Sequence, residues 1–429
     1  MPRPRTLRPL PHPAQIRRAS NALRSIIYEN RDHPGGLATQ AIAELWLELS
    51  NRFEEPVPIL STNYDQYVEL EIREGARLWI EMAEESDAEE PETVARLREA
   101  ANRGDLFTYL HGCIAENAEI TDFPVVSERD YFERSTSTQE AIAAHLEGSS
   151  CLIVGSGLTD VPLMNALLST RRKAREAGHS RYAIVPRIDI GATGASAEAR
   201  EVISAYSERL THFDVEGIYV DHFAQIGQFL AEARIASTLS EGEYAESSKR
   251  YGQRLSTWWS RWRETNAGSS YLERQRDHHM KLVECVAEIS QTLHAKDEHL
   301  KLELWLRWDP SLSSRLLRLW ASSYALFEDY HMTRTAEIAT DSRYACVQAF
   351  CEGKPTYDEN RQEGERWKTF LGIPLMPQQE SNLVVGTIVL ASMTAPAASC
   401  LGEGRQGSHH GVIDKAQGVG SLLAAAPGR

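Results

Sequence analysis

The chain has 429 residues, which is long enough for two or three domains of ordinary size. Its 61 acidic residues outnumber 46 basic ones, so the formal net charge of -15 disfavours nonspecific binding to nucleic acid or to an anionic membrane. No apolar stretch approaches the roughly 20 residues of a membrane span, and no secretory leader is visible. The six cysteines are scattered without a C-x-x-C pair, which is typical of a reducing compartment and argues against a structural zinc ribbon. We therefore expect a cytoplasmic protein.

The first segment, residues 1–36, is basic and contains several prolines. An organelle transit peptide is one interpretation, but the prolines suit it badly. We expect a disordered arm instead, or a start site placed within a longer reading frame.

Apolar runs alternate with helical patterns from residue 37 to residue 238. A helix is predicted over 37–53, and the apolar runs lie at 57–60, 108–116, 149–168, 181–186 and 215–220. This alternation predicts a parallel sheet with helices on both faces, a Rossmann-like α/β domain. Such folds bind ligands at the carboxyl ends of their strands.

The second half of the chain has a different pattern. Residues 239–277 are predicted to form a helical connector, in which Trp258, Trp259 and Trp262 share one helix face that packs against a neighbouring domain. Residues 278–394 predict an antiparallel sheet with flanking helices, an α+β domain. The predicted strands lie at 300–308, 316–324, 367–376 and 383–392, and the predicted helices at 278–295 and 342–354. Residues 395–429 are rich in Gly, Ala and Ser and are expected to be a disordered tail.

Three polar turns follow the strands of the first domain. They are Thr62-Asn63-Tyr64-Asp65, Leu110-His111-Gly112 and Gly155-Ser156-Gly157. If the strands are parallel, all three turns open on one edge of the sheet. Each has a simpler interpretation: the Asn and Asp could cap a helix, the His could be packed in a turn, and a single G-x-G occurs in many turns.

In this order, the turns resemble the sirtuin-like family of NAD-consuming domains. The matching motifs are T-N-x-D, L-H-G and a G-S-x-L that is followed by Asp160 and Pro162, with closing strands at 181–186 and 215–220. The resemblance spans residues 37–238. It implies a Rossmann-like fold and NAD as the substrate.

The family's functional residues carry over by motif. The resemblance implies that Asn63 orients the nucleophile at the anomeric carbon of the nicotinamide ribose, and that His111 acts as a general base toward a ribose hydroxyl or its relay. Asp65 would hold the nicotinamide carboxamide. The remaining predicted cofactor-binding residues are Thr62, Gly112, Gly155, Ser156 and Asp160.

Two departures from the family pattern bear on function. Sirtuin deacylases carry a zinc module with four cysteines, whereas this domain has only Cys113 and Cys151. The domain is therefore closer to zinc-free, sirtuin-like hydrolases of bacterial anti-phage defence, and we expect no metal. The family also opens with a strand and a G-A-G-x-S loop that cradles phosphate, and residues 1–57 contain no such motif. The chain is either truncated at its start or a degenerate binder.

The second domain, over residues 278–394, resembles a GAF domain. The resemblance is carried by the segments ACVQAFCEGKPTYDE, RWKTFLGIPL and VVGTIVLAS. It implies a sensory module that binds a small molecule or a protein signal, or that only dimerises. Cys346 and Cys351 are interpreted as helix residues rather than chromophore attachment sites.

Three hypotheses follow. The leading one is an NAD glycohydrolase, a bacterial stress or anti-phage effector regulated by the GAF-like domain. A second enzyme reaction, NAD-dependent protein deacylation, is disfavoured by the missing zinc module. The third hypothesis is a non-catalytic sensor that binds NAD or ADP-ribose. We expect no nucleic-acid or membrane partner and a possible homo-oligomer.

Overall fold

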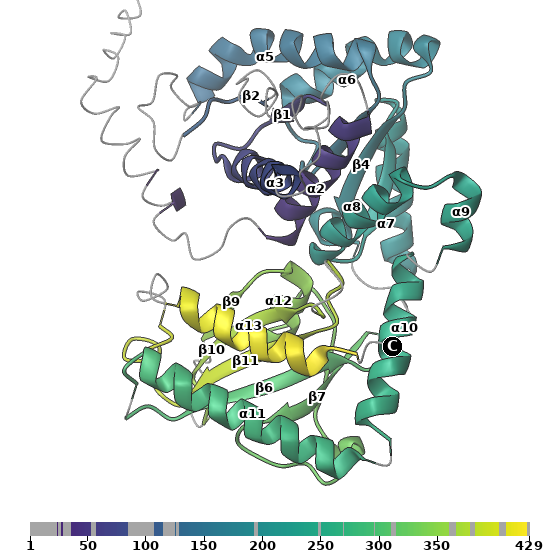
Figure 1. Ribbon diagram of the computed structural model, residues 1–429. Coiled ribbons are helices and arrows are strands. Elements are labelled where there is room, and N and C mark those ends of the chain that lie inside the picture. The colour runs from purple at the N-terminus through teal and green to yellow at the C-terminus, as the bar shows by residue number, and fades with distance from the viewer. Residues whose placement is uncertain are drawn as a thin grey trace, which may run out of the picture.

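The computed structural model describes two units, one above the other in Figure 1, with the long helix α10 along one side. The described residues are 24, 27–28, 36–52, 57–84, 107–114, 125, 128–192, 196–247, 250–268, 270–295, 297–309, 315–359, 366–377, 382–402 and 409–426. The basic arm expected over 1–36 lies almost wholly outside them.

The strands of the upper unit are all parallel, as the sequence predicts. Strand β1 (Ile59–Ser61) pairs with β2 (Phe107–Tyr109). Strands β3 (Cys151–Val154), β4 (Arg181–Pro186) and β5 (Glu216–Val220) form a second sheet in the order β3-β4-β5. The described strands therefore make two parallel sheets rather than one, because β1 does not pair with β3.

Helices cover both faces of the larger parallel sheet. On β4, Ala183 and Val185 face one core and Ile184 faces another, which is the alternation expected of a strand buried on both sides. These helices are α2 (Leu37–Arg52), α5 (Glu128–Gly148), α6 (Val161–Ala177), α7 (Ala197–Thr211) and α8 (Ala224–Ser237), whereas α3 (Tyr67–Glu84) packs with α2 against β1 and β2. Leu60 of β1 and Leu110, which follows β2, pack against the same core as β4. The two parallel sheets are thereby held together.

The lower unit is built on a six-stranded antiparallel sheet in the order β8-β7-β6-β11-β10-β9. Its strands are β6 (Leu300–Arg307), β7 (Leu316–Ser322), β8 (Thr335–Glu337), β9 (Thr356–Glu359), β10 (Thr369–Leu375) and β11 (Gly386–Ser392). Helices α11 (Tyr271–Thr292) and α13 (His410–Ala424) cover one face, and α12 (Ala345–Glu352) covers the other (Figure 1). The predicted α+β architecture is confirmed.

The predicted connector belongs to the core of the lower unit. Within it, α9 (Glu241–Glu246) precedes α10 (Tyr251–Asn266), and the three tryptophans of α10 are buried in the same cluster as α11, α13 and the sheet. The indole N–H of Trp258 donates to the carbonyl of Ala424 at 2.7 Å, and that of Trp262 donates to Leu423 at 3.0 Å.

The expectation of a disordered tail from residue 395 is wrong, because this segment contains helix α13. Val412, Ile413 and Ala416 of this helix are buried. Its small residues permit close packing: a Cβ at Gly420 would lie 2.5 Å from a methyl group of Leu375. The Gly- and Ala-rich composition reflects that packing rather than disorder.

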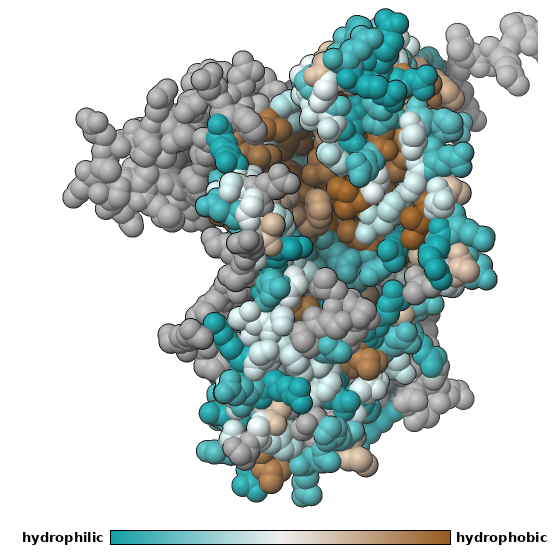
Figure 2. All heavy atoms as spheres, turned by 90° about the vertical axis from the view of Figure 1, so that its right-hand side faces the viewer, coloured by the Kyte–Doolittle hydropathy of each residue, from teal (hydrophilic) through white to brown (hydrophobic). Residues whose placement is uncertain are grey.

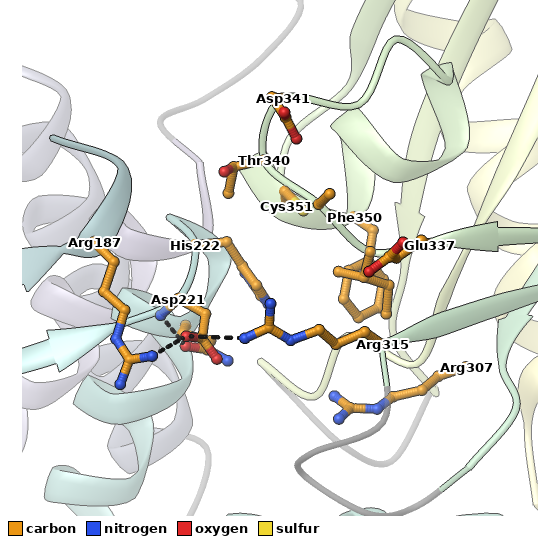
Figure 3. A pocket seen from close by; sticks show the side chains of 13 residues that line it. Arg187, Asp221, His222, Arg307, Arg315, Glu337, Thr340, Asp341, Phe350 and Cys351 are labelled. Atoms are coloured by element: carbon orange, nitrogen blue, oxygen red, sulfur yellow. Dashed lines mark hydrogen bonds and ion pairs between the residues drawn. The ribbon is translucent and has the colours of Figure 1, made fainter. Parts of the chain in front are cut away.

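The two units meet around a cavity lined by residues of both (Figure 3). Figure 2 shows an apolar area set back in the upper unit, whereas the visible junction between the units is mostly hydrophilic or neutral. The short helix η2 (Arg187–Ile190), which follows β4, begins at this junction. The junction thus lies at the carboxyl ends of β4 and β5.

Candidate functional site

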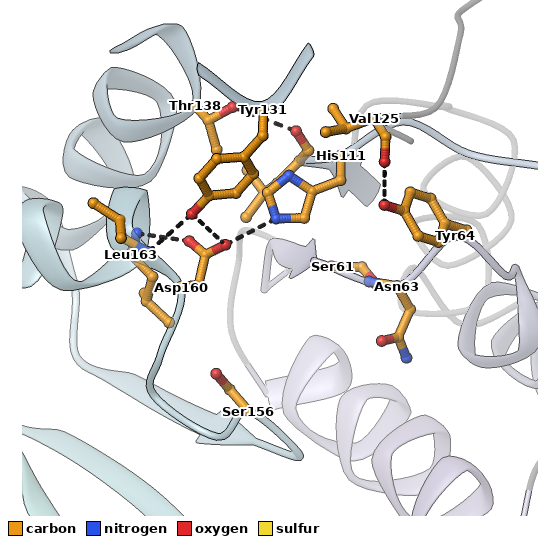
Figure 4. A network of polar contacts seen from close by, with 12 residues as sticks. Ser61, Asn63, Tyr64, His111, Val125, Tyr131, Thr138, Ser156, Asp160 and Leu163 are labelled. Atoms are coloured by element: carbon orange, nitrogen blue, oxygen red, sulfur yellow. Dashed lines mark hydrogen bonds and ion pairs between the residues drawn. The ribbon is translucent and has the colours of Figure 1, made fainter. Parts of the chain in front are cut away.

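The turns that follow β1 and β2 lie side by side and are joined by hydrogen bonds. The N–H of Leu110 donates to the carbonyl of Ser61, and the N–H of Ile114 donates to that of Tyr64, both at 2.8 Å. The Tyr64 hydroxyl donates to the carbonyl of Val125, whose own N–H donates to the carbonyl of His111 at 2.8 Å (Figure 4). The parallel pairing therefore brings the first two predicted turns together.

The first turn caps a helix as well as facing the site. The Asp65 carboxylate accepts a hydrogen bond from the N–H of Tyr67 at 3.1 Å, at the start of α3. The N–H of Asn63 donates to the hydroxyl of Ser61 at 3.1 Å, and Asn63 itself is exposed. Thr62, between them, is half-buried. The helix-capping interpretation of Asp65 is confirmed, and Asn63 is accessible to a ligand.

The centre of the site is a contact between a histidine and a carboxylate. Nε2 of His111 lies 2.9 Å from Oδ2 of Asp160, and their side chains are 11% and 15% exposed. Asp160 is held there because it caps α6: its Oδ1 accepts from the N–H of Leu163 at 2.9 Å, and Pro162 stands in the first turn. An N-terminal helix position also favours the negative charge of the carboxylate.

Tyr131 of α5 completes the network, and the sequence analysis missed it. Its hydroxyl lies 3.3 Å from Oδ2 of Asp160 and accepts from the N–H of Val161 at 3.0 Å. Its ring lies 5.7 Å from that of His111, centroid to centroid. Burial raises the pKa of Tyr131, so the phenol stays a neutral donor. No local motif marks this residue, because it stands on a helix 29 positions before Asp160.

The third turn has an unusual backbone. Gly155 has φ +70° and nothing within 4 Å of the position where a Cβ would be, so a ligand could approach its main chain. Leu158 is fully buried at φ 50°, a conformation that costs energy for a non-glycine residue. The Ser156 hydroxyl accepts from the N–H of Leu158 at 3.2 Å, and Arg209 donates to the Leu158 carbonyl at 2.9 Å. These bonds fix the turn.

The structure gathers the predicted residues around one region. In Figure 4, the side chains of Asn63 and Ser156 project on the same side of the His111–Asp160 pair. Gly112 has φ 85° and is buried, so it shapes the second turn. The arrangement offers a histidine oriented by a carboxylate, an exposed amide and an open glycine turn. These groups suit general base chemistry on a polar ligand.

Among the described residues, no group of three or more His, Cys, Asp or Glu side chains is placed to hold a metal ion. Their six cysteines are all free thiols, and four of them are buried in the lower unit. In the same part of the chain, no helix combines the length and the apolar character needed to cross a membrane.

The fold and the site define a parallel α/β domain with polar strand-end turns, the class that commonly binds nucleotides. Residues 57–210 match the family model for the SIR2-like domain. This range includes every predicted site residue, from Thr62 to Asp160, and it indicates an NAD-related, sirtuin-like activity. No curated protein matches the chain. The match does not extend into the lower unit, whose GAF identity stays a prediction.

Proposed function

We propose that the protein is an NAD glycohydrolase, which converts NAD to nicotinamide and ADP-ribose. In this reaction the oxygen of water bonds to the anomeric carbon of the nicotinamide ribose. The bond from that carbon to the nicotinamide nitrogen breaks, and its electron pair stays on the nitrogen, so nicotinamide leaves uncharged. A general base must accept the proton that water loses.

The observation that carries the proposal is the His111–Asp160 pair. When a neutral histidine donates Nε2–H to a carboxylate, the other ring nitrogen, Nδ1, becomes the basic one. Asp160 would therefore fix the tautomer of His111 and stabilise the ring when it takes up a proton, as carboxylates do in other histidine-dependent sites.

The remaining predicted residues take binding roles in the proposal. Asn63 positions the water by its amide. Asp65 uses its second carboxylate oxygen for the nicotinamide carboxamide, since the first one caps α3. Gly155 and Ser156 offer main-chain and hydroxyl groups to ribose or phosphate. The lower unit would act as a sensory or dimerising module that regulates an effector of bacterial stress or anti-phage defence.

Release of nicotinamide from NAD by the purified protein tests the proposal. We expect Asn63→Ala and His111→Ala to lower turnover by at least about 100-fold, the usual range for loss of a general base. His145→Ala is the matched control, because His145 is exposed on α5 and outside the site. Turnover that survives both site changes would refute the proposal.

A second candidate is a non-catalytic sensor that binds NAD or ADP-ribose. One observation favours it: the Asp160 carboxylate caps α6, so its position beside His111 has a structural explanation that requires no catalysis. Calorimetry separates the two functions, because the sensor would bind NAD stably without releasing nicotinamide. Nicotinamide release that required an acylated peptide would indicate a deacylase instead.

A further inference from the structure

A cavity of about 200 Å³ lies between the SIR2-like domain and the lower unit (Figure 3). The upper unit contributes residues that follow β4 and β5 and the first turn of α8. The lower unit contributes the end of β6, the residue before β7, the end of β8 with the segment after it, and part of α12. The residues that matter here are Arg187, Asp221 and His222 from above, and Arg307 and Arg315 from below. The proposed catalytic residues His111 and Asn63 are not among the lining residues.

Three guanidinium groups converge on this cavity from two units. Arg187 lies 2.9 Å from a carboxylate oxygen of Asp221, and Arg315 lies 3.9 Å from the same oxygen. Arg307 is only 4% exposed. One carboxylate thus stands between arginines of the two units, while the two other lining carboxylates, on Glu337 and Asp341, are exposed to solvent. Arg307 is the most buried of the charged lining residues, whereas the side chains of Asp221 and Arg315 are 41% and 37% exposed, so the positive charge is screened least in the inner part of the cavity, which favours an anion there.

His222 adds a second kind of recognition. It is 5% exposed, and its Nδ1 has no hydrogen-bond partner among the described residues. Its ring interacts with the backbone of Cys351, and burial lowers its pKa to about 4. The ring is therefore neutral at ordinary pH. With the other nitrogen donating to the backbone, Nδ1 is left as a hydrogen-bond acceptor for a ligand hydroxyl.

We propose that this cavity binds a small sugar phosphate, with the phosphate on the arginines and a sugar hydroxyl on His222. Arginine forks match phosphate oxygens in pairs, and a buried unpartnered acceptor is satisfied by a hydroxyl donor. The volume suits a compact molecule rather than a whole dinucleotide, because ordinary small-molecule sites measure roughly 300 to 1,000 Å³. A ligand held by both units would also fix their relative position.

Calorimetric titration of the full chain with ribose 5-phosphate tests this proposal. We expect Arg315→Gln to weaken binding by at least about tenfold, because a hydrogen bond to a charged group is lost. Arg261→Gln is the control, since it removes the same charge from an exposed position on α10 outside the cavity. Arg315 is itself partly exposed, so its replacement should not prevent folding, and circular dichroism of the variant verifies this.

Two further variants test the chemistry. His222→Phe should reduce the preference for ribose 5-phosphate over inorganic phosphate, because only the sugar supplies a hydroxyl beside the ring. Asp221→Asn should tighten binding several-fold, because it removes a carboxylate that competes for the arginines. Absence of binding in the millimolar range, or equal weakening by Arg315→Gln and Arg261→Gln, would overturn the proposal.

A titration of the His111→Ala variant, in which NAD should stay largely intact, in the presence of saturating NAD identifies the source of the sugar phosphate. Unchanged affinity would show an independent metabolite, whereas competition would show that the cavity takes one sugar-phosphate end of NAD while the rest of the dinucleotide lies outside it. The proposal does not depend on catalysis: ribose 5-phosphate binding is measured directly, and it can succeed or fail whatever the outcome for nicotinamide release.

Discussion

Nε2 of His111 lies 2.9 Å from Oδ2 of Asp160, and this contact ties the end of β2 to the first turn of α6. The two residues are 49 positions apart in the chain. Asp160 thus has two partners: one oxygen caps the helix and the other faces the histidine. The two oxygens can be tested separately.

Asp160→Asn should separate capping from orientation. Asparagine caps helices about as well as aspartate, so thermal stability should change little. The amide has no charge to stabilise a protonated His111, so nicotinamide release should fall by about 10-fold or more. Asp160→Ala should lose the same activity and in addition about 1 kcal/mol of stability. Full activity of Asp160→Asn would exclude the orienting role.

Tyr131→Phe should loosen the same network without a change in charge. It removes the donor to Asp160 and the acceptor of the Val161 N–H. We expect a loss of about 1 kcal/mol in the free energy of unfolding, the usual value of a hydrogen bond, measured by urea denaturation. Phe132→Leu is the control, because that neighbour is 74% exposed and should be close to neutral.

Asp65 also has two roles that substitutions can separate. Asp65→Asn should preserve the cap on α3 and hence stability, whereas Asp65→Ala should cost roughly 0.5 to 2 kcal/mol. If the second oxygen holds the nicotinamide carboxamide, both variants should weaken NAD binding measured by calorimetry. Weaker binding in Asp65→Ala alone would mean that Asp65 acts only as a cap.

Acid should destabilise the folded chain, in part through His278 of the lower unit. This ring is 5% exposed and accepts the indole N–H of Trp320 at 2.8 Å, and burial lowers its pKa from 6.5 to about 4. The unfolded chain therefore takes up a proton first as pH falls. The stability from this group is complete above pH 6.5 and is lost progressively toward pH 4, by about 3 kcal/mol in all.

Denaturation midpoints between pH 7 and pH 4 measure this effect. His278→Gln should reduce the acid-dependent loss of stability by roughly half. The other half should remain, because the pKa of His222 is lowered to a similar value and this residue is unchanged in the variant. If the denaturation midpoint of His278→Gln fell between pH 7 and pH 4 as much as that of the unchanged protein, His278 would not be a source of the acid sensitivity.

Helix α13 should be essential to the lower unit. Trp262→Phe removes the donor to the carbonyl of Leu423 and should cost about 1 to 3 kcal/mol, the penalty for a buried unsatisfied group. Trp259→Phe loses the same part of an indole ring on the same helix and serves as the control. Equal losses in the two variants would mean that ring area, and not the bond to α13, decides the effect.

Much of the architecture was predictable from local patterns. The run at 181–186 is strand β4 as observed, because a continuous apolar run bounded by polar residues suits a strand buried on both faces. The runs near 300 and 316 pair antiparallel, as the turn between them predicts. The prediction of a disordered tail was wrong because composition does not reveal close packing. The small residues that suggested disorder allow α13 to approach the sheet.

The sequence by itself determined the three strand-end turns and their order, since strand and turn signals act over a few residues. Only the tertiary structure decided which side chains meet. Tyr131 contacts Asp160 because α5 lies beside α6. Arg187 and Arg315 both lie near the Asp221 carboxylate because the two units pack against each other. Such contacts depend on how distant elements pack, and no short-range pattern records that.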